Sequence, residues 1–157
     1  GIDRAILVPP SWEGDRNDIA IEAAQAHPDR FAIMGRLPVE SPDAASLLAL
    51  KDHPGMLGPR FTFHTPLSRP WLTDGTADWL WSAAEEVDIP LMIFVPGSVP
   101  ALDAIAERHP GLRLVVDHLA LRAVEFAVAL REPMDTLLET WRLHGHELDY
   151  GVGATLG

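Results

Sequence analysis

Short apolar runs alternate along the chain with longer stretches in which apolar residues recur at helical spacing. The runs show little alternation of apolar and polar positions, which is typical of parallel strands buried on both faces. We predict strands over 4–8, 30–37, 56–63, 90–95 and 112–117. Helices are predicted between them, over 17–26, 42–52, 76–87 and 100–108.

The ends of the predicted helices carry recognisable signals. Ser41 followed by Pro42 is a favourable start for the second helix. His-Pro pairs at His27, His53 and His109 each follow a helix and precede a strand. Because proline stops a helix, we interpret these three histidines as structural residues at helix ends, on the side where strands begin.

Apolar side chains on two of the predicted helices indicate how these helices pack. Helix 17–26 places Ile19, Ala23 and Ala26 on one face. Trp79 and Trp81 stand two positions apart and cannot share a helix face. We expect one tryptophan in the core and the other beneath a loop.

The alternation of strand and helix implies an α/β fold with parallel strands and right-handed crossovers. Two architectures fit this pattern, an open doubly wound sheet and a (β/α)₈ barrel. No G-x-G-x-x-G follows the first strand, and the single lysine, Lys51, lies in a predicted helix. A dinucleotide site and a phosphate-binding lysine loop are therefore not expected.

Composition narrows the classes of partner. The 157 residues carry a formal net charge of −11, which argues against nucleic acid and against an anionic membrane surface. There is no cysteine, so disulfides and cysteine-ligated zinc are excluded. We find no signal peptide and no apolar run long enough to span a bilayer, and we expect a cytoplasmic protein.

Polar residues gather where the predicted strands end, which is where parallel α/β folds carry their chemistry. Arg36 ends the second strand, Arg60 lies in the third with His64 at its end, and Asp117-His118 ends the fifth. Arginine suits a carboxylate, and histidine can ligate a metal or transfer a proton near neutral pH. These residues are candidates for one site that binds a small anionic substrate.

Each candidate also has a structural interpretation. Arg36 and Arg60 could be ion-paired with acidic residues, His118 could bond to backbone, and His64 could belong to an ordinary loop. Asp117 is interpreted as structural. Adjacent strand residues point to opposite faces, so Asp117 and His118 are not expected to face one pocket together unless the strand has ended before them. Trp12 and Trp71 lie in predicted loops, where they either wall a pocket or cover the core.

A second histidine pair, His144 and His146, has the H-x-H spacing of some metal sites. The preceding residues 136–143 read as a helix that Gly145 ends. Two histidines alone are a weak signal for a metal.

Four segments together resemble the amidohydrolase-related family, also known as the second amidohydrolase family. They are GIDRAILVPPS, HPDRFAIMGRLP, GMLGPRFTFH and HPGLRLVVDHLAL, and they extend to about residue 121. The family includes pyrone-dicarboxylate lactonases and aminocarboxymuconate-semialdehyde decarboxylases. Its fold is a (β/α)₈ barrel, so the resemblance implies a single-domain partial barrel that lacks the first strand and the C-terminal units. Residues 122–157 are not assigned: either the subgroup diverges there or the sequence departs from its original reading frame.

The resemblance also implies roles for individual residues. Arg60 matches the family's substrate-facing arginine, and His118 matches a histidine that binds metal or polarises the substrate. Relatives often have a histidine where Phe94-Val95 stands here. The implied cofactor is a divalent metal, zinc or manganese, with His118 as a ligand, although some lactonases of the family work without one.

These lines converge on a hydrolase that acts on a small carboxylated lactone or similar ring. His118 and His64 are the predicted catalytic residues, and Arg60 and Arg36 are predicted to bind the substrate. The alternatives are a metal-dependent decarboxylase of the same family and an inactive fragment that assembles, for example as a homo-oligomer. Arg60 and His118 must open onto a common mouth for any of the enzymatic interpretations to hold.

Overall fold

Five parallel strands form one sheet in a computed structural model that describes residues 2–40 and 44–120. The strands are β1 (Ala5–Leu7), β2 (Phe31–Gly35), β3 (Met56–Thr62), β4 (Leu91–Phe94) and β5 (Leu114–Val116). Each lies within one of the five predicted ranges, so the five predicted strands are confirmed.

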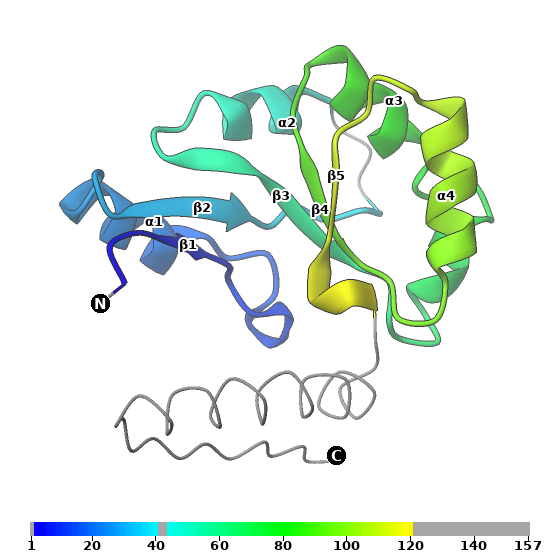
Figure 1. Cartoon of the computed structure of the whole chain (residues 1–157), viewed down its shortest axis with the longest axis horizontal. Coiled ribbons are helices and arrows are strands. Elements are labelled where there is room, and N and C mark those ends of the chain that lie inside the picture. The colour runs from blue at the N-terminus through cyan, green and yellow to red at the C-terminus, as the bar shows by residue number, and fades with distance from the viewer. Residues whose placement is uncertain (1, 41–43, 121–157) are drawn as a thin grey trace, which may run out of the picture.

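The order of the strands decides between the two predicted architectures. Neighbours in the sheet are neighbours in the sequence from β1 to β5, with no reversal of direction. A doubly wound sheet would reverse its strand order at a switch point. Instead the sheet curls into a half-barrel (Figure 1), and the predicted partial (β/α)₈ barrel is confirmed.

Four helices connect the strands. They are α1 (Asp18–Ala26), α2 (Ala44–Lys51), α3 (Asp78–Glu86) and α4 (Val99–Arg108). Short 3-10 helices cover Ser11–Glu13, Arg69–Leu72 and Asp117–Ala120. The predicted start of α2 at Ser41 and Pro42 lies outside the described residues. Within the described part of the chain, every helix is too short or too polar to cross a membrane.

Alternation along β3 separates the core from the opposite face of the sheet. Phe61 and Phe63 are almost fully buried and pack with Trp81 of α3 in the main core. Because side chains of a strand alternate, the positions between and beside them, Arg60 and Thr62, point to the other face. The helices therefore cover one face, and the polar residues of β3 are displayed on the inner face of the half-barrel.

Helix α1 packs through a different face from the predicted one. Ala20 and Ala24 are buried against Ile33 of β2, whereas Ile19 is 64% exposed. The small alanine side chains let the helix backbone approach the sheet closely. Ile19 consequently points outward.

The two tryptophans of α3 lie in different environments, as predicted. Trp81 is fully buried in the core. Trp79 is partly buried and donates a hydrogen bond from its indole nitrogen to the carbonyl of Val39, 2.9 Å away in the segment after β2. One ring thus fills the core, and the other anchors a loop.

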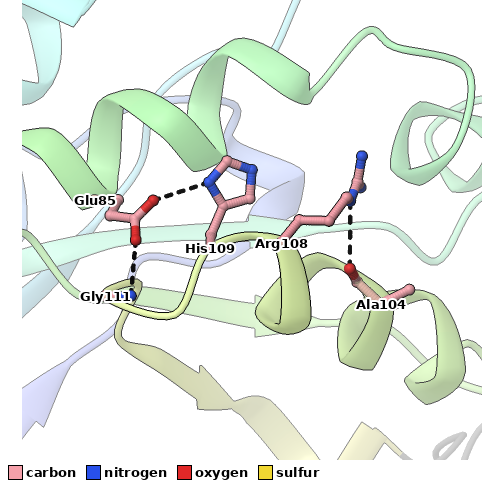
Figure 2. Close-up of polar contacts among 5 residues, drawn as sticks. All are labelled: Glu85, Ala104, Arg108, His109 and Gly111. Atoms are coloured by element: carbon pink, nitrogen blue, oxygen red, sulfur yellow. Dashed lines mark hydrogen bonds and ion pairs between the residues drawn. The ribbon is translucent and has the colours of Figure 1, made fainter.

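The histidines of the His-Pro pairs lie at helix ends, as predicted. His27 ends α1, His53 follows α2, and His109 ends α4. Figure 2 shows that Glu85 of α3 joins His109 Nδ1 at 2.9 Å and accepts a hydrogen bond from the backbone N–H of Gly111 at 2.7 Å. These bonds lower the pKa of the Glu85 carboxyl, His109 contributing most and Gly111 next. Glu85 therefore ties α3 to the turn that leads into β5.

Both edge strands expose apolar side chains. Ile6 on β1 is 53% exposed, and Val115 and Val116 on β5 are 44% and 42% exposed. In a closed barrel every strand has a neighbour on each side. These side chains lie along the two sides on which the described sheet stays open.

Candidate active site

A cavity of about 270 Å³ lies at the carboxyl ends of β3, β4 and β5. Its walls are Val8, Pro10, Ser11, Trp12, Arg60, Thr62, His64, Phe94, Asp117 and His118. Three of the four predicted site residues, Arg60, His64 and His118, therefore share one cavity. The fourth, Arg36, is not in its wall.

The alternation of β3 continues just past its end and directs side chains into the cavity. Arg60 and Thr62 of β3 and His64, two residues after the strand ends, line the same cavity, whereas Phe61 and Phe63 between them enter the core. β4 lies alongside in parallel register and places Phe94 beside Thr62. A buried strand thus fixes the spacing of a cation and an imidazole.

Arg60 is held by Asp117 from the other side of the cavity. Nε donates to Oδ2 of Asp117 at 2.6 Å, and Nη2 lies 2.5 Å from the same oxygen. The two side chains are only 9% and 16% exposed. Arg60 is therefore ion-paired with an acidic residue, as its structural interpretation predicts. Its position in the cavity wall is also compatible with binding a substrate.

The fifth strand ends before its polar pair. β5 stops at Val116, and Asp117 begins a 3-10 helix in which His118 has φ 48°. The strict alternation of a strand no longer applies there, so both side chains reach the cavity. Nε2 of His118 lies 3.5 Å from Oδ1 of Asp117. The acid and the imidazole are adjacent in space as well as in sequence.

Phe94 is the aromatic centre of the cavity. Its ring lies 5.6 Å from the His64 ring and 5.3 Å, edge to face, from the His118 ring. The Arg60 guanidinium carbon stands 5.8 Å from the same ring centre, within cation–π range. The end of β4 carries no titratable group. Its Phe94 ring instead contacts the side chains of Arg60, His64 and His118.

Arg36 lies deeper, just after β2. Its backbone exchanges two hydrogen bonds with the Asn17 side chain, at 2.7 and 2.9 Å. Its side chain is 9% exposed, with Nε 3.7 Å from Asp15 Oδ1. Nε and Nη1 are buried and donate no hydrogen bond to the described residues. Burial lowers the pKa of Arg36. The negative charge of Asp15 raises this pKa, and the positive charge of Arg60 lowers it further.

The charges around His64 favour its neutral form. Burial lowers the pKa of the imidazole, and the positive charges of Arg60, Arg36 and Arg69 lower it further. A neutral imidazole can accept a proton, so His64 is available as a base at neutral pH.

We expect the imidazole of His64 to titrate below 6.5, the ordinary value for histidine. The unfolded chain then binds the proton first, so His64 contributes full stability above the unfolded pKa and opposes folding as the pH falls below it. NMR titration of the folded protein measures the midpoint, and the same signal in urea is the control. A folded midpoint at or above 6.5 would contradict the prediction.

Several residues of the cavity are not predicted as site residues from the sequence. Asp117 is interpreted there as structural, Phe94 is noted only as the replacement of a histidine, and Thr62 and Val8 are not singled out. The alternation that places Arg60 and His64 on one face also places Thr62 there, so this residue could have been found. The partnership of Asp117 with Arg60 joins positions 57 apart and has no local signal.

The described residues contain no group of three His, Asp or Glu side chains close enough to share a metal ion. His64 and His118 line the cavity, but Asp117 is engaged by Arg60. This part of the chain therefore does not by itself fit a complete metal site. The H-x-H pair His144 and His146 lies outside the described residues.

Comparison with known proteins gives consistent results. The family model described as amidohydrolase matches residues 1–147, beyond the segments that carry the resemblance. No curated protein matches the chain. A similar solved structure is a probable 2-pyrone-4,6-dicarboxylic acid hydrolase from Acinetobacter baumannii with citric acid bound. The two proteins are 22% identical with a TM-score of 0.59, and the match covers 75% of this chain and 43% of the Acinetobacter chain.

A second similar structure is 5-carboxyvanillate decarboxylase from Novosphingobium aromaticivorans, complexed with manganese and 4-hydroxy-3-methoxy-5-nitrobenzoic acid. It is 24% identical with a TM-score of 0.60, over 94% of this chain and 53% of its own. At these identities the likeness establishes the fold. The chain spans about half the length of both structures.

Proposed function

The chain belongs to the amidohydrolase family, and from this premise we propose that it carries the substrate-binding side of a hydrolase for small carboxylated lactones or similar rings. The observation that supports the proposal is the shared cavity of Arg60, His64 and His118 at the carboxyl ends of the strands. The similar Acinetobacter structure, a probable hydrolase of a dicarboxylic acid, supports the substrate class.

Each residue has a role in the proposed reaction. Arg60 binds a substrate carboxylate and stabilises the negative charge that develops on the carbonyl oxygen. His118 removes a proton from water, with neutral His64 as the second candidate base. The water oxygen bonds to the lactone carbonyl carbon, the ring C–O bond breaks, and the imidazole returns the proton to the leaving oxygen.

Arg36 has an indirect part in this proposal. It is buried and does not line the cavity, and its charge acts on Arg60 and His64. Two of its nitrogens, Nε and Nη1, are buried without a hydrogen-bond acceptor among the described residues. Because Arg36 is absent from the cavity wall, we derive no direct contact between it and the substrate, and its predicted role in substrate binding reduces to its charge.

Decarboxylation is the second candidate, because the similar Novosphingobium structure is a decarboxylase and covers most of this chain. That enzyme is complexed with manganese, and a divalent metal is the cofactor implied for this chain as well. His118 is the one metal ligand that the family resemblance implies among the described residues. These residues contain no group of three donors that could complete a metal site around it. We therefore derive no step through a metal.

Two assays on the purified protein separate the candidates. Loss of ultraviolet absorbance from a pyrone dicarboxylate reports ring opening, and release of CO₂ from a carboxylated phenol reports decarboxylation. Ring opening without CO₂ supports the proposal, and CO₂ release alone replaces hydrolysis by the second candidate. Inactivity on both, with zinc or manganese supplied, would contradict both.

Arg60→Lys keeps the charge but removes the planar fork. We expect KM for the carboxylated ring to rise roughly 10- to 100-fold, the loss of about one charge-assisted hydrogen bond. Arg113→Lys is the matched control, because Arg113 pairs with Asp88 on the surface, outside the cavity wall. An unchanged KM in Arg60→Lys would contradict the carboxylate role.

A further inference from the structure

One carboxylate stands between the two polar groups that the proposed reaction needs. Oδ2 of Asp117 binds Arg60, and Oδ1 lies 3.5 Å from Nε2 of His118. All three side chains line the same cavity. We propose that Asp117 is a positioning residue, whose carboxylate fixes the Arg60 guanidinium beside His118 so that both face one substrate. This inference rests on the proposed function.

The geometry of the pair leaves Arg60 able to bind a ligand. Asp117 takes the side of the guanidinium formed by Nε and Nη2, and it does so with a single oxygen. Nη1 and the second N–H of Nη2 form the other edge, to which no described residue is hydrogen-bonded. A carboxylate can bind that edge with both of its oxygens. Asp117 therefore selects the edge that meets the substrate and does not compete for it.

Two contacts together hold the guanidinium still. Asp117 fixes it from one side, and the Phe94 ring lies 5.8 Å from its central carbon. Both members of the ion pair are largely buried, so breaking the pair would leave an uncompensated charge in a partly dry site. A fixed arginine loses less conformational freedom when it binds an anion, which is the benefit of positioning.

The placement of Asp117 follows from the end of β5. The 3-10 helix that starts at Asp117 brings two successive side chains into one cavity. In a continuing strand one of them would point into the opposite layer. The turn thus makes a single carboxylate accessible to both Arg60 and His118.

Asp117→Asn tests the proposal, with Asp88→Asn as its matched control. Asp88 pairs with Arg113 at 2.9 Å, but these side chains are 73% and 54% exposed and lie outside the cavity wall. The probe is isophthalate, an unreactive ring with two carboxylates, titrated by calorimetry. We expect Asp117→Asn to weaken isophthalate binding roughly tenfold or more, and to raise KM more than it lowers kcat, while Asp88→Asn changes neither. Equal or tighter binding by a folded Asp117→Asn would overturn the proposal, because Asp117 would then be a competitor.

The NMR signal of the Arg60 Nε–H gives a readout that needs no ligand. We expect a resolved signal in the wild type and in Asp88→Asn, and its loss through fast exchange in Asp117→Asn. If the wild type binds no isophthalate and turns over no substrate, the proposed function fails. The Arg60 signal still tests independently whether Asp117 fixes the Arg60 side chain. Retention of the signal in Asp117→Asn rejects this fixing.

Asp117→Glu covers the case in which the asparagine variant does not fold. The longer acid keeps the charge and displaces the carboxylate by one methylene. We expect the Arg60 signal to shift and the affinity for isophthalate to fall severalfold, with recovery of thermal stability. A shifted signal with unchanged affinity would overturn the positioning role.

Discussion

Replacing His118 with alanine is expected to lower the turnover number of the proposed ring opening by about 10²–10⁴-fold. The imidazole lines the cavity with Arg60 and lies beside the Asp117 carboxylate, as a base toward water requires. Removing it leaves Arg60 to bind the substrate, so KM should change much less than kcat. Steady-state kinetics on the pyrone dicarboxylate measures both constants.

The backbone at His118 requires a second variant. His118 has φ 48°, a conformation that alanine adopts with strain and asparagine tolerates well. His118→Asn therefore removes the base without the strain, and it should lose activity to the same extent. His53→Ala, at a helix end outside the cavity wall, should keep wild-type turnover. Wild-type turnover in both His118 variants would refute the role of this residue.

Replacing Gly58 with alanine should have the largest effect on stability. A Cβ at this position of β3 would lie 2.0 Å from the carbonyl oxygen of Pro90, just before β4. Backbone cannot rotate away as a side chain can, so the two strands must separate. We expect the free energy of unfolding to fall by at least about 3 kcal/mol, the upper end of overpacking penalties. Urea denaturation followed by tryptophan fluorescence measures it.

Gly35→Ala is the matched control within the same sheet. The nearest atoms to its new Cβ belong to side chains, namely Sδ of Met56 at 2.9 Å, Cε of Met56 at 3.0 Å and Oδ1 of Asn17 at 3.1 Å. A methionine side chain can adopt another rotamer at modest cost. The loss of stability should therefore be clearly smaller than for Gly58→Ala. Equal losses in the two variants would contradict the explanation by backbone contact.

Much of the fold was accessible from the sequence because local signals carry it. Apolar runs bounded by His-Pro pairs locate the strands, and the uniform alternation of strand and helix implies parallel pairing. The strand order that separates a barrel from a doubly wound sheet is not local, and it needed the structure. The apolar face expected for α1 contains Ile19, which is exposed; the helix packs through Ala20 and Ala24 instead, because their small side chains allow close packing.

The candidate site was predictable only in part, for the same reason. Arg60 and His64 follow from alternation on one strand, and His118 from the end of another. The sequence also groups Arg36 with them, but its burial and the bonds of its backbone to Asn17 depend on the packing of α1 against β2. The engagement of Asp117 by Arg60 depends on where β5 ends, which the apolar run alone does not define.

The most direct test of the account is a crystal structure of the protein with isophthalate bound. We expect one carboxylate within about 3 Å of the free edge of the Arg60 guanidinium, with the Arg60–Asp117 pair intact and the ring beside Phe94 and His118. Isophthalate bound elsewhere on the protein, with this cavity empty at saturating concentration, would contradict the account.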